Sequence, residues 1–214
     1  MQQRYNTFYY IHKGLRGMLF DTGMELQKTD FRSTSQRADV SSKLTEVLEL
    51  ISRHSFHEDR YIFPPIAAYH SKLMEELEKD HLYGEALNEQ LLKLLEDLKA
   101  ADHPHKWQTL GLQICRAFNR YLAFHLQHME KEEEKVNQLL WEKFSDQEIA
   151  DMKGAIVGPD LSSHLLVEVD WILKSISESE ADSWLQGIRG RVSETIFNAF
   201  VALANKNGFR VDDH

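Results

Sequence analysis

Cysteine is nearly absent from this sequence, which has only Cys115 among its 214 residues. A single cysteine excludes a disulfide within the chain, and a protein without disulfides is typical of a reducing compartment. Cys115 stands among apolar residues such as Leu112 and Ile114, so we expect a small core side chain and not a nucleophile. The cysteine content therefore favours a cytoplasmic protein.

Proline and glycine are also scarce, with four and ten residues. Because both residues interrupt helices, their scarcity predicts an all-α protein, as do the long runs rich in Leu, Glu, Lys and Ala. The sequence contains no glycine-rich phosphate loop and no nucleophile–base arrangement of the hydrolase type. No apolar stretch approaches the ~18–20 residues that a membrane span requires. We therefore expect a helical protein that does not enter a membrane.

Histidine and glutamate, in contrast, recur at a helical spacing. Four histidines are followed by a glutamate four residues later, three of them before residue 135, and residues four apart lie on the same face of an α-helix. Each pair can therefore present one imidazole and one carboxylate to a common point. Several helices of this kind would build a nitrogen and oxygen site for a transition metal. The pairs are His54 and Glu58, His81 and Glu85, and His128 and Glu132.

The positions of four histidines agree with one arrangement of helices. In an antiparallel helical hairpin, two residues equidistant from the turn lie at the same height, because both helices rise by about 1.5 Å per residue. The midpoints between successive histidines fall at 33, 67–68 and 104–105, each on or beside a polar or proline-containing break. We therefore predict an up-down-up-down four-helix bundle in which these histidines are level: His12, His54, His81 and His128.

The same histidines lie on apolar helical stripes. The residue four positions before each of them is Phe8, Leu50, Leu77 or Phe124, which predicts that all four face the core. His125 has Met129 and no carboxylate at the following helical position, so we leave it out of the site. The pair His164 and Glu168 has no level partners and is interpreted as incidental.

Acidic residues outnumber basic ones by 34 to 25, which gives a net charge of −9. Nucleic-acid binding requires a basic surface, so the charge argues against it. The acidic run at 130–134 contains Glu133 and Glu134, which we interpret as a solvent-exposed helix face. Glu132 differs from them because it lies four residues after His128, on the same face of the predicted helix.

Breaks in the pattern divide the chain into a bundle and an extension. Pro64 and Pro65 should end or kink the second helix, and Ser145 with Glu148 predicts a capping box that opens a further helix. The expected domains are a metal-binding bundle at 1–143 and a helical extension at 144–214 that packs on it. The expected helices are 5–28, 35–63, 72–100, 105–143, one from Ser145, and, after a break at 158–159, 161–176, 180–188 and 192–205.

Four segments of the chain resemble the hemerythrin-like, or HHE cation-binding, family. The most specific match is the second, because its histidine, its acidic pair and its Phe-Pro keep the family's relative spacing. The resemblance covers about residues 5–143, and the remainder is similar to C-terminal extensions of bacterial members. The matching segments are 11–16, 54–64, 80–81 and 128–133.

The resemblance implies a non-haem di-iron centre in which the four level histidines are terminal ligands and Glu58 and Glu132 bridge the two ions. Zn or Mn could take the place of iron. The family's third helix often supplies a second ligand one turn after its histidine, and here that position is Glu85. Such a site would be richer in carboxylate than that of an oxygen-carrying hemerythrin, which disfavours simple reversible oxygen carriage.

Three functions follow from these observations. The first is a metal-binding protein that binds or senses O₂, NO or peroxide, or handles iron, as a monomer or homodimer. The second is a redox enzyme of the peroxidase or reductase type at the same di-metal site, and the third is a metal-free helical interaction scaffold. We favour binding over enzymatic activity.

Overall fold

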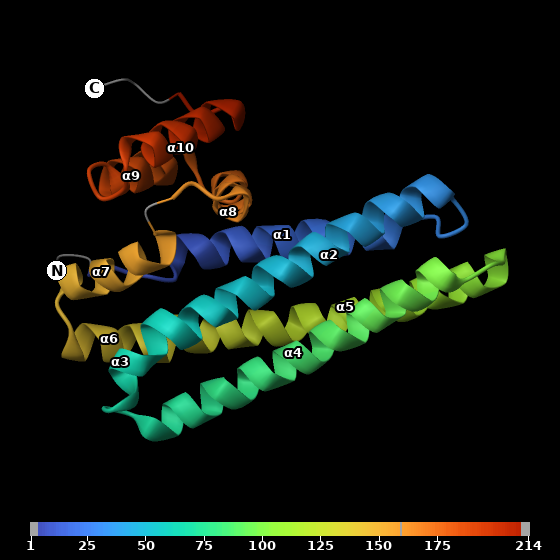
Figure 1. Ribbon diagram of the computed structural model, residues 1–214, viewed down its shortest axis with the longest axis horizontal. Helices are drawn as coiled ribbons and strands as arrows, with labels where there is room; N and C mark the ends of the chain where they lie inside the picture. Colours follow the sequence, from blue (N-terminus) through green and yellow to red (C-terminus); the bar gives the residue numbers. More distant parts are fainter. Residues whose placement is uncertain (1–3, 159, 211–214) are drawn as a thin grey trace. The chain divides into compact units, whose positions relative to one another are not determined.

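The computed structural model describes residues 4–158 and 160–210, and over these residues it contains helices and no β-strand. Figure 1 shows the chain. The predicted all-α fold is confirmed; Pro159 of the predicted break lies outside the described residues. The helices are α1 (Tyr9–Lys28), α2 (Thr34–His57), η1 (Glu58–Ile62), α3 (Phe63–Ala67), α4 (Ser71–Ala100), α5 (Pro104–Lys131), η2 (Glu132–Val136), α6 (Asn137–Lys143), α7 (Asp146–Val157), α8 (Ser163–Lys174), α9 (Glu178–Ile188) and α10 (Glu194–Lys206).

The chain divides into two compact units. No described helix is both long and apolar enough to cross a membrane. The first unit comprises the described residues of Met1–Gly17, His57–Ile66 and Lys131–His214, and the second comprises Met18–Phe56 and Ala67–Glu130.

The second unit is the predicted up-down-up-down four-helix bundle, formed by most of α1, α2, α4 and α5 (Figure 1). Polar contacts join neighbouring helices: the Lys43 ammonium on α2 lies 2.5 Å from Asp21 of α1, and Asn88 of α4 donates a hydrogen bond of 2.6 Å to Ser52 of α2. The thiol of Cys115, on α5, lies 3.6 Å from the carbonyl oxygen of Leu26 on α1. Cys115 is half-buried at this contact and is not one of the fully buried core residues that we expected.

Apolar side chains at helical spacing fill the interior of this bundle. Each helix buries the stripe that its sequence period predicts, because the other faces carry charge. Burying such side chains contributes about 1.5–3 kcal/mol each. The buried residues include Met18, Leu19, Val40, Leu44, Leu48, Leu77, Leu91, Ile114 and Phe118.

The connections between helices lie close to their predicted places, at 29–33, 68–70 and 101–103. One boundary differs from the prediction. Pro64 and Pro65 do not end the second helical segment, because they lie in the first turn of α3, which continues to Ala67. The π-helical turn η1 immediately precedes them, and such an irregularity is typical where a proline removes an amide N–H from a continuous helix.

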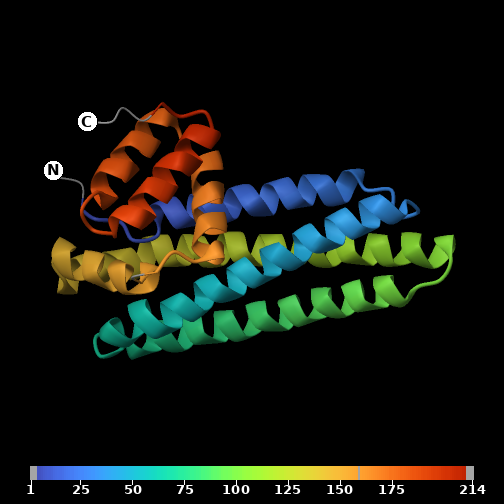
Figure 2. The ribbon, with the colours of Figure 1, turned by 45° about the horizontal axis from the view of Figure 1, so that its top comes forward.

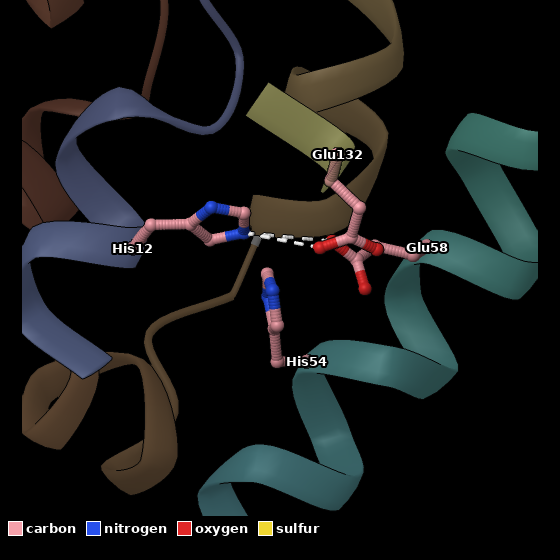
Figure 3. Close-up of side chains that lie close together, drawn as sticks. All are labelled: His12, His54, Glu58 and Glu132. Carbon is pink, nitrogen blue, oxygen red and sulfur yellow. Dashed lines mark ion pairs between the residues drawn. The ribbon is translucent and has the colours of Figure 1, made fainter. Parts of the chain in front are cut away.

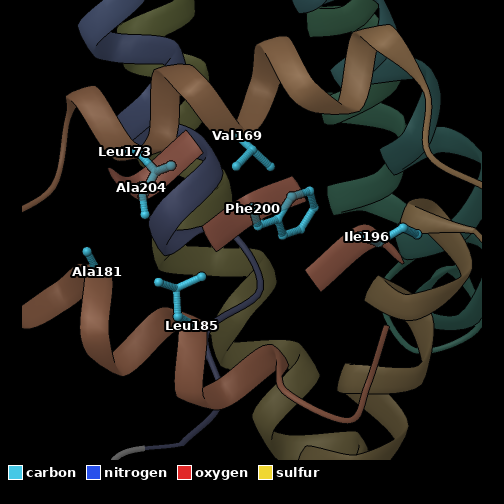
Figure 4. Close-up of a cluster of buried hydrophobic side chains, with 7 residues drawn as sticks. All are labelled: Val169, Leu173, Ala181, Leu185, Ile196, Phe200 and Ala204. Carbon is cyan, nitrogen blue, oxygen red and sulfur yellow. The ribbon is translucent and has the colours of Figure 1, made fainter. Parts of the chain in front are cut away.

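The last three helices of the first unit share a small apolar core. Figure 2 shows α8, α9 and α10 gathered together, and Figure 4 shows the side chains between them. The predicted capping box at Ser145 and Glu148 is present at the start of α7, and Ser177 with Glu180 forms a second one at α9. The core consists of Val169, Leu173, Ala181, Leu185, Ile196, Phe200 and Ala204.

These C-terminal helices hold the beginning of α1. A Cβ atom at Gly14 would lie 2.9 Å from the backbone nitrogen of Ile172 in α8, so only glycine allows this approach. Glu180 of α9 accepts hydrogen bonds from Tyr9 at 2.5 Å and from Lys13 at 2.6 Å. Because Tyr9 and Lys13 stand on either side of His12, the C-terminal helices fix the segment that carries this histidine.

We expect Gly111→Ala to destabilise the bundle, because the new Cβ atom would lie 2.3 Å from the Phe31 ring. Overpacking of this kind costs about 1–3 kcal/mol of unfolding free energy. Gly154→Ala is the matched control: nothing lies within 4 Å of its added Cβ atom, so this variant should gain up to about 1 kcal/mol. Urea unfolding measures both, and equal effects would contradict the packing described.

We expect the contribution of Glu180 to stability to depend on pH. Hydrogen bonds from Lys13 and Tyr9 lower the pKa of Glu180 from 4.5 to about 2. A lowered folded-state pKa stabilises the protein above pH 4.5, and this stabilisation is lost as the pH falls towards 2. Glu180→Gln should therefore cost about 0.5–1 kcal/mol at pH 7, since the pair is partly exposed, and nearly nothing at pH 2.

Thermal unfolding of the Glu180→Gln variant at the two pH values measures this difference. Glu178→Gln, an exposed change in the same helix, is the control and should show a smaller change with pH. An equal cost of Glu180→Gln at both pH values would contradict the assignment.

Candidate metal centre

His12 is fully buried and is held between carboxylates. Its Nδ1 lies 2.9 Å from Oε1 of Glu133, while its Nε2 lies 3.8 Å from Glu58 and 3.6 Å from Glu132. Figure 3 marks the last two distances with dashed lines. With a proton on Nδ1, His12 donates to Glu133, and its Nε2 faces the other two carboxylates. An outer carboxylate behind a histidine in this way is typical of metal-binding imidazoles.

Six of the predicted residues come together in two groups. Within each group, one possible ligand atom from every residue lies within 4.8 Å of the others. Glu58 and Glu132 belong to both groups, and Figure 3 draws the first. The first group is His12, His54, Glu58 and Glu132, and the second is Glu58, His81, His128 and Glu132.

Both shared glutamates begin a π-helical turn. Glu58 opens η1 and Glu132 opens η2, and each carbonyl oxygen accepts from the amide five residues later, in Phe63 and Asn137. Such wide turns are rare and are frequent at functional sites. His54 and His128 lie before these turns, so each is separated from its glutamate by one ordinary α-helical turn. The extra residue of the π-helical turn comes only after each His/Glu pair.

Glu133 takes part in the site, so its interpretation as a solvent-exposed residue was wrong. Besides His12, it binds Arg16 at 2.7 Å. Burial alone would raise the pKa of Glu133, but its contacts with His12 and Arg16 hold it below the usual value. Helical phase alone could not reveal this role, because Glu133 follows the residue at which the α-helix widens.

The buried environment also shifts the pKa of His12. Burial of the imidazole lowers this pKa, but the hydrogen bond with Glu133 and the nearby negative charges outweigh it, so the pKa lies above its ordinary value. A metal ion at Nε2 would therefore have to displace a proton, and its affinity would fall as the pH decreases.

The second group has a similar outer carboxylate. Nδ1 of His128 lies 3.4 Å from Asp80, which directly precedes His81 in α4. The rings of His81 and His128 lie 4.8 Å apart at 69°. Two imidazoles in adjacent positions on one ion would have ring centres about 4.5 Å apart, so this pair fits a metal ion.

Glu85 lies in neither group, and its side chain is exposed. The buried face of α4 passes through Gly84 and Leu87, and Glu85 projects to the other side. The structure therefore does not bring Glu85 together with the other predicted residues. His164 is also exposed and belongs to neither group, as expected.

A lysine from the C-terminal part of the chain interacts electrostatically with Glu58. Helix α7 packs against η1. Burial lowers the pKa of the Lys153 ammonium on α7, and the charges of Glu168 and Glu58 oppose this effect. Lys153 is therefore part of the electrostatic surroundings of Glu58.

The donor atoms suit a divalent transition metal. Imidazole nitrogen and carboxylate oxygen together are ligands for iron, manganese and zinc, at about 2.0–2.2 Å. Neighbouring donors around such an ion lie about 3–3.5 Å apart, and the distances of 3.6 and 3.8 Å from Nε2 of His12 are only slightly longer. The residues therefore fit a metal ion with small movements of side chains.

The model of the hemerythrin HHE cation binding domain matches residues 4–140 of the chain. Because this match spans more than half of the chain, the protein belongs to that family. No curated protein and no solved structure gives a significant match. The family and the two His/Glu groups together support cation binding.

We expect Glu133→Gln to weaken metal binding, because the amide does not fix the proton on Nδ1 of His12 as a carboxylate does. Loss of such an outer partner typically costs 10–100-fold in metal affinity. Glu134→Gln is the matched control, since Glu134 is exposed in the same turn. Competition with a coloured chelator measures both affinities, and equal values for the two variants would contradict the role of Glu133.

Proposed function

We propose that the protein binds two metal ions, with iron as the expected metal, and that Glu58 and Glu132 bridge the two ions. The observation that carries this proposal is that both glutamates belong to both groups of possible ligands. A carboxylate has two oxygen atoms and can therefore hold one ion on each. Two imidazoles would complete each side: His12 and His54 on one ion, and His81 and His128 on the other.

A centre of this composition favours the binding of a small molecule. Each ion would have two imidazoles and the two shared carboxylates, which is fewer than the six donors of an octahedral ion. The exposed position of Glu85 leaves a place in the second group unfilled. We infer that O₂, NO or peroxide binds or is sensed there, or that the protein handles iron.

We infer that residues 144–214 hold residues of the first group in place. Helix α7 packs against η1, which begins at Glu58. Helices α8 and α9 hold the segment of α1 around His12, through Ile172 and Glu180. Two of the residues that would hold the first ion are thus fixed by helices outside the part of the chain that the family model matches.

We expect two iron ions per chain after anaerobic loading, and about one in either His54→Ala or His128→Ala. Each histidine belongs to only one group, so each variant should lose one ion. His105→Ala, an exposed change in α5, should keep both. Elemental analysis of desalted protein gives the stoichiometry.

Removal of the metal provides a second readout. A ligand that binds only the folded state stabilises it by RT ln(1 + [L]/Kd), which is about 2.7 kcal/mol at a hundredfold excess over Kd. Chelation should therefore lower the unfolding temperature of the loaded protein. Full metal content in both alanine variants would contradict a centre built from these histidines, whereas a wild-type protein that takes up no metal and whose stability is unchanged by chelator would favour the metal-free scaffold.

A further inference from the structure

Helix α5 carries another histidine beside the second group. His125 stands one turn before His128 and is buried, with 5% of its surface exposed. The two rings lie 6.5 Å apart and are nearly perpendicular, at 81°. His125 and His128 both face the interior of the bundle, although no carboxylate follows His125 at helical spacing.

The position of His125 is not that of a ligand to the same ion. Two imidazoles on opposite sides of one ion have ring centres at most about 6.4 Å apart, and adjacent ones about 4.5 Å. His81 and His128, at 4.8 Å, fit the adjacent arrangement. His125 also belongs to neither group of possible ligand atoms that lie within 4.8 Å of one another, so we place it outside the set of ligands.

Helix α4 has a glycine where it approaches the His125 ring. A Cβ atom at Gly84 of α4 would lie 3.2 Å from Cε1 of His125 and 3.0 Å from the Phe124 ring. Any side chain at position 84 would therefore press on the imidazole. The close approach of α4 holds the His125 ring in one place.

A second polar side chain lies beside His125. The rings of Tyr121 and His125 are 4.3 Å apart, and the Tyr121 hydroxyl is buried with no hydrogen-bond partner among the described residues. A buried polar group without a partner costs about 1–3 kcal/mol. The unpartnered Tyr121 hydroxyl beside His125 therefore points to a ligand at this place.

His125 and Glu132 lie on opposite sides of His128 along α5. Glu132 lies four residues after His128 and His125 lies three residues before it, which corresponds to about 6 Å and 4.5 Å in opposite directions. A small molecule held by His128 on the side away from Glu132 would therefore lie near His125.

We propose that His125 donates a hydrogen bond from its imidazole N–H to a small anionic ligand, of the azide or peroxide class, bound to the metal ion of the second group. This role rests on the di-metal centre proposed above. Hydrogen bonds to an ionised acceptor are stronger than neutral ones. His125 thereby selects ligands that carry negative charge and retains them on the ion.

The test uses the full chain loaded with Co²⁺, whose visible absorption changes when azide binds. His125→Phe keeps an aromatic ring but removes the donor, and His125→Gln keeps an N–H donor. We expect azide affinity to fall about tenfold or more in His125→Phe and to stay near the wild-type value in His125→Gln. His105→Phe, the same change at an exposed position of α5, should bind azide as the wild type does.

The other possible results distinguish a failure of the proposed role of His125 from a failure of the di-metal centre. Unchanged azide affinity in His125→Phe overturns the proposal, as does a wild-type protein that holds two Co²⁺ ions but does not bind azide. A loss of one Co²⁺ ion in His125→Phe would identify His125 as a ligand and would also overturn it. A wild-type protein that takes up fewer than two Co²⁺ ions contradicts the di-metal centre itself.

Discussion

The burial of two carboxylates among histidines is the constraint on which this structure depends. Glu58 and Glu132 expose 2% and 0% of their surface, and a buried carboxylate is costly unless cations balance it. The raised pKa of His12 supplies part of that balance. Divalent metal ions between the carboxylates and the imidazoles would supply the rest.

Several irregular features serve this arrangement. The two π-helical turns begin at the two shared glutamates, and outer carboxylates stand behind one histidine of each group, Glu133 at His12 and Asp80 at His128. The C-terminal helices fix the beginning of α1. Apolar packing alone explains none of these features, whereas a site that needs fixed donor atoms explains all of them.

The bundle and most of the site could be predicted from the sequence, because both depend on regular helices. The spacing of His54 and Glu58 identifies one helix face, and the distance of His81 from its neighbours along the chain identifies the turns. Such inferences require only 3.6 residues per turn and a constant rise. They hold wherever the chain is a regular α-helix.

The remaining features depend on departures from that regularity or on contacts between helices. A π-helical turn has no signal in the sequence period, so Glu133 was placed on the surface. The spacing from His81 to Glu85 is the same as in the other pairs, yet the buried face of α4 runs through Gly84, and Glu85 is exposed. Only the packing of α4 and α5 shows that His125 belongs beside the second group.

Anomalous diffraction at the iron absorption edge, from crystals of the iron-loaded protein, would locate the metal ions relative to the two shared carboxylates. Two anomalous peaks about 3.5–4 Å apart, the separation typical of two-metal sites, should lie on either side of the Glu58 and Glu132 carboxylates. A single peak, or two peaks that do not share these carboxylates, would contradict the account.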